Sequence, residues 1–192
     1  MELSYKNIIA QTKELIFNSD EFWKRKSTCK EGVREVLVMY LLPVLLVAAI
    51  AVFIGEFFRR TDFFIEYPLL KALREVLLFV LQYYVGIFFT TELMKTYGGE
   101  KDKEAARKLV GYSFVPFMLA SIVTGLFEFL YVLDILGLYG FYLFWQGAKV
   151  LVKLPEHKAH SYIVITIVVN FFTFSFFSWF LGRLLEFIII YL

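Results

Sequence analysis

Five apolar blocks, separated by charged stretches, dominate the pattern of hydrophobic and polar positions along the chain. A hydrocarbon core of roughly 30 Å is crossed by about 20 helical residues, and each block is close to that length. The blocks lack the alternation with period two that is typical of membrane β-strands. The sequence therefore predicts an all-α, polytopic membrane helix bundle in residues 35–192, with five transmembrane helices at about 36–58, 75–95, 107–128, 134–153 and 160–183.

Residues 1–34 are predicted to be a separate arm, because they are too polar to span a membrane. One helical face of this arm, with members three or four positions apart, consists of Tyr5, Ile8, Ile9, Thr12, Leu15 and Ile16. Such an amphipathic helix either lies in the plane of the lipid headgroups or packs on the ends of the spans. The two arrangements are compatible, and we expect the arm to be cytoplasmic.

Lys and Arg are distributed unevenly around the five blocks. With the arm on the inside, 15 of the 20 flank the inner ends of the spans and four flank the outer ends, Arg183 being set aside. The positive-inside rule then predicts a cytoplasmic N-terminus and an external C-terminus. The net charge of +2 reflects this asymmetry, and we expect no nucleic-acid partner.

Small residues recur on one face of span three, in the stretch "GYSFVPFMLASIVTGLF" (residues 111–127). Gly111, Ser121 and Gly125 share that face, and Gly140 and Gly147 lie seven residues apart in span four. Small residues mark contact faces in membranes because helices associate there through close packing rather than through the hydrophobic effect. We therefore expect spans three and four to form an antiparallel hairpin with their small faces together.

Pro116 lies inside span three, where it removes one backbone donor and frees the carbonyl of Tyr112. A neighbouring helix or the Ser113 hydroxyl can satisfy the freed carbonyl. The sequence thus predicts a kinked span that is built for tight packing.

Two segments resemble the Yip family, the Ypt-interacting membrane proteins and their prokaryotic relatives: "GYSFVP" (Gly111–Pro116) and "LYGFYLFWQGAKVLVKLPEHKA" (Leu138–Ala159). The resemblance extends over most of the chain, from the arm through five spans and the hairpin of spans three and four. It implies a non-enzymatic organiser, adaptor or trafficking-type factor that acts through helix packing and a cytoplasmic arm. Eukaryotic members carry an Asp-Leu-Tyr-Gly-Pro element near the first span that this chain lacks. We therefore expect a prokaryotic-type member in the plasma (inner) membrane.

Residues suited to catalysis or metal binding are sparse. His157 and His160, with Glu156, are a poor metal cage because zinc enzymes usually need three well-placed ligands. The stretch "TYGGEKDKE" (residues 96–104) lacks the Gly-Lys-Ser/Thr ending of a phosphate-binding loop. Cys29 is the only cysteine, and we expect it to be a reduced thiol. The sequence therefore predicts neither enzyme activity, nor a cofactor, nor a metal.

Polar residues inside the spans are the best functional candidates, since each is costly in lipid. They are Gln82, Glu128, Gln146, Asn170 and Arg183. One interpretation is hydrogen bonding between helices. The alternative is a transport path, which would make the protein a small oligomeric transporter or channel. The expected partners are the lipid bilayer, a further copy of the chain and a protein at the cytoplasmic face.

The C-terminal block is too long for a single perpendicular span. Residues 162–192 would form a helix of about 46 Å, and Gly182 and Arg183 indicate where it leaves the hydrocarbon core. Arg183 is expected to pair with Glu186. We predict that Leu184–Leu192 lies along the outer interface, over the ends of other spans or against a second copy.

The charge asymmetry gives a test of topology by cysteine-accessibility labelling in sealed membranes. A cysteine at Ser19 should be labelled only from the cytoplasmic side, and a cysteine at Asp62 only from the outer side. Labelling of the Ser19 position from outside would contradict the predicted orientation.

Overall fold

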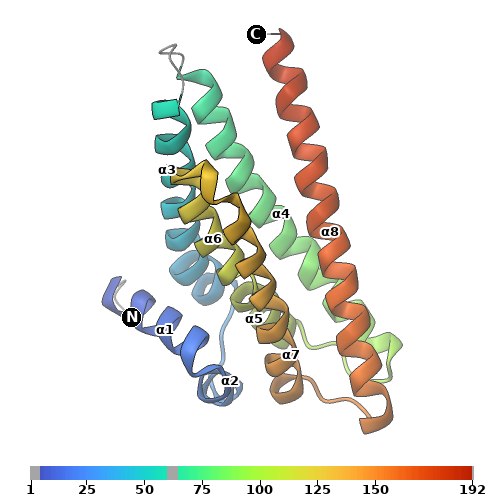
Figure 1. Ribbon diagram of the computed structural model, residues 1–192. Coiled ribbons are helices and arrows are strands. Elements are labelled where there is room, and N and C mark those ends of the chain that lie inside the picture. The colour runs from blue at the N-terminus through green and yellow to red at the C-terminus, as the bar shows by residue number, and fades with distance from the viewer. Residues whose placement is uncertain (1–4, 60–64, 192) are drawn as a thin grey trace.

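A computed structural model describes residues 5–59 and 65–191, in which every regular element is helical (Figure 1). The helices, in chain order, are α1 (Tyr5–Phe17), α2 (Ser19–Thr28), η1 (Arg34–Leu41), α3 (Leu42–Arg59), α4 (Glu66–Thr96), α5 (Lys103–Ser113), α6 (Val115–Leu126), η2 (Glu128–Leu138), α7 (Tyr139–Leu151) and α8 (Glu156–Tyr191). The predicted all-α fold class is confirmed. Arg60 and Asp62, which entered the charge count and the labelling test, lie outside the described residues.

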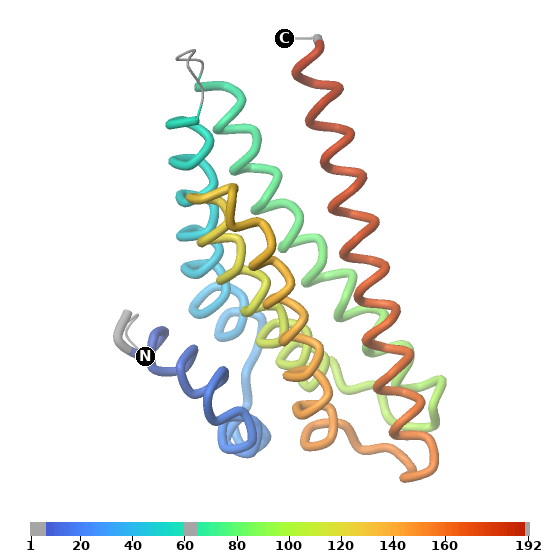
Figure 2. The backbone as a smooth tube through the Cα atoms, viewed as in Figure 1, coloured from blue at the N-terminus to red at the C-terminus, as the bar shows by residue number. Residues whose placement is uncertain are grey.

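Five segments are long and apolar enough to cross a membrane. They are Arg34–Arg59, Glu66–Thr96, Lys103–Leu126, Glu128–Leu151 and Glu156–Ile190. Span one thus consists of η1 and α3, span three of α5 and α6, and span four of η2 and α7. The long helices α4 and α8 pack against each other along one side of the bundle, as Figure 2 shows in green and red.

Prolines account for the irregularities of spans one and three. Pro43 follows the π-helix η1, where the Leu42 N–H bonds to the carbonyl of Leu37, five residues back. This wider turn accommodates a residue that lacks an N–H and whose ring would crowd the preceding turn. Pro116 stands in the first turn of α6, a position where a helix needs no donor. Span three is broken there, since Phe114 ends α5 and begins α6.

The closest helix contact joins spans one and three. A Cβ placed on Gly55 of α3 would lie 1.8 Å from the carbonyl oxygen of Gly125, and one on Gly125 would lie 2.8 Å from a methyl group of Val52. The α7 helix of span four approaches span three only lower down, where a Cβ on Gly140 would lie 2.1 Å from the Ser113 carbonyl oxygen. The expectation that the small faces of spans three and four meet is therefore wrong at Gly125.

The η2 helix is the physical reason for this difference. The chain after α6 does not turn directly into the α7 helix but first forms the 3-10 helix Glu128–Leu138, which packs along α6. The α7 helix begins only at Tyr139, beside the lower half of span three. The upper half of span three therefore turns its glycine face to α3.

The α8 helix continues without a break from Glu156 to Tyr191, about 54 Å. Its C-terminal end stands clear of the other helices at the top of Figure 1. Arg183 pairs with Glu186 at 2.9 Å, as expected. The helix continues through Arg183 to Tyr191, and the location of Leu184–Leu192 along the outer interface stays a prediction.

The arm packs on one end of the bundle, which is one of the two predicted arrangements. The short helices α1 and α2 meet at an angle, and α2 lies against α7 (Figure 1). Leu15, Phe22 and Trp23 are fully buried. A Cβ on Gly147 of span four would lie 2.6 Å from the Trp23 ring, so this glycine makes room for the arm.

The contact at Gly55 gives a test of the packing. The change Gly55→Ala should destabilise the bundle by about 1–3 kcal/mol, because the new methyl group collides with backbone that cannot rotate away. The matched control is Gly182→Ala in α8, where the nearest atom is 4.0 Å away and the loss of a helical glycine should stabilise slightly. Unfolding temperatures in one detergent compare the two variants. A Gly55→Ala protein as stable as the parent would refute the contact.

Candidate functional site

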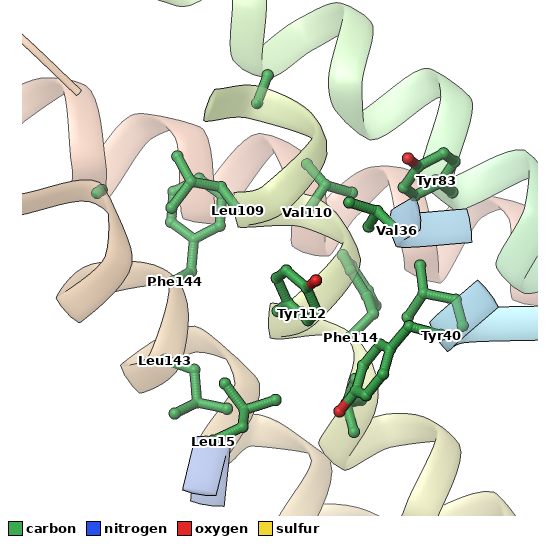
Figure 3. Close-up of a cluster of buried hydrophobic side chains, with 14 of the residues drawn as sticks. Leu15, Val36, Tyr40, Tyr83, Leu109, Val110, Tyr112, Phe114, Leu143 and Phe144 are labelled. Carbon is green, nitrogen blue, oxygen red and sulfur yellow. The ribbon is translucent and has the colours of Figure 1, made fainter. Parts of the chain in front are cut away.

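Tyr112, at the end of α5, is the centre of a buried aromatic cluster. Its ring lies 4.9 Å from the ring of Phe22, 5.0 Å from that of Tyr40 and 6.0 Å from that of Trp23. Figure 3 shows Tyr112 among side chains from the arm and from spans one to four. Gly111 precedes it and leaves space for Val36, since a Cβ there would lie 2.6 Å from that side chain. The Gly-Tyr pair is therefore where the arm meets the bundle.

A polar triangle joins this tyrosine to the arm. The Lys26 ammonium donates to Glu31 at 2.5 Å and to the Tyr112 hydroxyl at 2.7 Å. The Tyr112 hydroxyl donates in turn to the other oxygen of Glu31 at 2.9 Å. Lys26 is only 5% exposed. Burial lowers the pKa of Lys26 from its ordinary value, and the bond to Glu31 acts in the opposite direction.

A second buried lysine holds the end of α2. The Lys108 ammonium donates to the carbonyl oxygen of Lys26 and to Glu104, both at 2.8 Å, and also to the Cys29 carbonyl. Cations are favourable at a helix C-terminus, where carbonyl groups lack partners. Glu104 also accepts the backbone N–H of Glu31 at 3.0 Å. The two lysines, the two glutamates and Tyr112 thus form one network between the arm and α5, which we call the arm lock.

The arm lock specifies one position for the arm rather than adding much net stability. The attraction within a buried ion pair is about equal to the cost of removing both charges from water. Removal of one partner leaves an unpaired buried charge and destabilises the protein by about 3–5 kcal/mol. A displaced arm would keep its own Lys26–Glu31 pair, and α5 would keep its Lys108–Glu104 pair. It would lose the bonds of Lys26 and Glu31 to Tyr112 and the bond of Lys108 to the Lys26 carbonyl. This site was not predicted from the sequence, because both lysines counted only as positive charges expected on the cytoplasmic side. The signal that pointed toward it was the "GYSFVP" motif, which contains Tyr112.

Gln82 and Asn170, two of the predicted polar candidates, meet in the interior of the bundle. Gln82 donates to the Asn170 side chain at 3.2 Å, and Asn170 donates to the Thr90 hydroxyl at 3.3 Å and to the Thr166 carbonyl at 2.9 Å. The bonds of Asn170 to Gln82 and Thr90 join α4 to α8, whereas its bond to Thr166 lies within α8. Gln82 is fully buried and Asn170 is 2% exposed.

The other three candidates lie elsewhere. Gln146 donates to Tyr142 on its own helix at 2.8 Å. Glu128 pairs with Arg59 at the opposite end of the bundle from the arm. Arg183 forms its exposed pair on α8. The structure therefore brings together only one pair of the five predicted residues.

A layer of four phenylalanines separates the inner polar pair from the end that holds Glu128. Phe79 and Phe174 each lie within four positions of Gln82 or Asn170, and their rings are 5.8 Å apart. Phe114 and Phe117 complete the layer at 5.6 and 5.1 Å from Phe174. Within residues 5–59 and 65–191, no group of three or more His, Cys, Asp or Glu side chains could hold a metal ion.

Comparison with known proteins gives one match. The family model of the Yip1 domain matches residues 13–177. This range contains both sides of the arm lock, the "GYSFVP" motif and all but the end of span five. No curated protein and no solved structure matches the chain.

The arm lock predicts the effect of Tyr112→Phe. The change removes two hydrogen bonds but keeps the ring. We therefore expect the free energy needed to detach the arm from the bundle to fall by about 1–3 kcal/mol. Amide hydrogen exchange in α2 should become faster by roughly tenfold or more. The control is Tyr142→Phe, which removes only an exposed bond to Gln146. Equal exchange in α2 of both variants would contradict the proposed role of Tyr112.

Proposed function

Because the chain belongs to the Yip1 family, we propose that this integral membrane protein is a non-enzymatic adaptor, which presents its N-terminal arm to a protein partner at the cytoplasmic face. The observation that carries the proposal is the arm lock between Lys26, Glu31 and Tyr112. The proposed orientation has the N-terminus inside and the C-terminus outside a prokaryotic plasma membrane, in line with the charge asymmetry.

A fixed arm suits recognition better than a free tail does. A disordered segment loses conformational entropy when it binds, whereas a segment already held in its bound shape does not. The α2 helix buries Phe22, Trp23 and Lys26 on one face. Its opposite face displays Asp20, Glu21 and Lys24 to solvent. This mixed-charge face, held at the end of the bundle, is the surface that we assign to the partner.

The packing favours an adaptor over a transporter or channel. A transport path through Gln82 and Asn170 would need those side chains to face a water-filled route. They instead bond to each other, and the phenylalanine layer lies between them and the charged end of the bundle. The interhelical bond thus supports a structural role for both residues.

Site-specific photo-crosslinking in native membranes tests the adaptor proposal. A photoreactive residue at Lys24, which is exposed on α2, should give a defined protein adduct. The same residue at Tyr131, which is 68% exposed on η2 at the other end, should not. In the Tyr112→Phe background the Lys24 adduct should decline strongly. Lipid adducts alone at Lys24, or a protein adduct that persists unchanged without the Tyr112 hydroxyl, would refute the proposal.

A further inference from the structure

A pocket of about 360 Å³ with both charged and apolar lining lies at the end of the bundle opposite the arm. Its walls come from α3, α4, α6, η2 and α8. Six charged residues line it: Arg59, Lys71, Arg74, Glu75, Glu128 and Asp134. The phenylalanine layer forms its floor through Phe79, Phe117 and Phe174. Sites for small ligands occupy about 300–1,000 Å³, so the pocket is sized for a small polar group.

The pocket lies at a depth where the same helices are apolar outside. On α4, Leu69, Leu73 and Leu77 are 57%, 51% and 42% exposed, whereas Glu75 on the inner face is 8% exposed. On α8, Phe176 and Trp179 are exposed on either side of Ser178, which lines the pocket. Charged groups enclosed at membrane depth are expensive and mark functional sites by default.

The charges are held by the protein, yet several remain available to a ligand. Arg74 donates to the Ser178 carbonyl and hydroxyl at 2.9 and 3.0 Å. The Lys71 ammonium, which has three donors, donates to Glu56 at 2.6 Å. Glu128 pairs with Arg59, but its side chain is 67% exposed. The exposed Asp134 accepts a bond from Thr124 at 2.9 Å.

We propose that this pocket binds the headgroup of a zwitterionic phospholipid that carries a primary ammonium, with its phosphate near Lys71 and Arg74 and its ammonium near Glu128 and Asp134. The phosphate would meet the cations of α4, and the ammonium would meet the carboxylates of η2. The lipid tails would lie against the exposed apolar face of α8 beside the pocket.

The balance of charge selects this ligand class. The lining holds three cations and three carboxylates, and Glu56 adds a further carboxylate behind Arg59 and Lys71. An anionic headgroup would therefore meet no net positive charge, whereas a group with both charges finds a partner for each. Carboxylates accept hydrogen bonds from a primary ammonium. A choline headgroup offers no N–H and is typically held by aromatic cages instead.

Ligand titrations of the purified, delipidated full chain test the proposal. The probes are dihexanoyl phosphatidylethanolamine, phosphatidylcholine and phosphatidylglycerol. Soluble glycerophosphoethanolamine is the comparison compound that lacks lipid tails. The readout is the dissociation constant from the rise in unfolding temperature. We expect the ethanolamine lipid to bind at least several-fold more tightly than the other two lipids, and the soluble compound to bind more weakly than the lipid.

Three variants locate the site. Arg74→Gln should weaken both the ethanolamine and the glycerol lipid by about tenfold or more, because it removes a charge-assisted bond to phosphate. Asp134→Asn keeps an acceptor for Thr124 and should reduce the preference for ethanolamine, because the ammonium loses one of its two carboxylates and the anionic glycerol lipid meets one carboxylate fewer. Arg183→Gln, which is outside the pocket on α8, should change nothing. If Arg74→Gln fails to fold, Asp134→Asn decides.

Several results would overturn the inference. Phosphatidylglycerol binding as tightly as the ethanolamine lipid would refute the charge argument. An unchanged lipid preference in Asp134→Asn would show that the ammonium does not bind in this pocket. Glycerophosphoethanolamine binding as tightly as the lipid would show that the site takes a soluble zwitterion rather than a membrane lipid.

Discussion

The approach of α3 to α6 at Gly55 and Gly125 is the contact on which much of the architecture depends. Helices in lipid gain nothing hydrophobic by meeting, so dispersion at short range and internal hydrogen bonds must hold them together. The absence of two side chains lets the backbones touch. Arg59 then reaches the carbonyl oxygens of both glycines, at 2.8 and 3.2 Å, and pairs with Glu128 on η2. One glycine contact thus also fixes the end of the hairpin.

Polar groups in this bundle follow the same logic at three depths. At each depth a side chain that would be costly alone donates a hydrogen bond to another helix. Lys26 donates to Tyr112, Gln82 to Asn170, and Arg74 to Ser178. Such bonds add little net stability in membranes, but a wrong arrangement leaves buried charge or amide groups unpaired. The polar residues therefore select one arrangement of helices that apolar packing alone would leave less defined.

The sequence was sufficient for the fold class because span length and helical periodicity are local properties. It also indicated that Gly125 and Gly140 would be contact points, since a stripe of small residues is visible in one helix. It could not name the partner of Gly125, which depends on how far η2 folds back along α6. The arm lock was hidden for a related reason. Lys26 and Tyr112 are 86 positions apart, and nothing local in either segment distinguishes a buried lysine from a surface one.

Span three links the two ends of the molecule, but not as a single rigid rod. Its lower half, α5, carries Tyr112 and Lys108 of the arm lock, whereas its upper half, α6, carries Ser121, which bonds to Glu75 in the wall of the pocket. The two halves are separate helices because Pro116 begins a new one after Phe114. The Phe114 ring belongs to the phenylalanine layer, so the break coincides with the apolar boundary between the two polar ends. A proline in a membrane helix therefore has a simple structural consequence here: each half of the span aligns with its own partners.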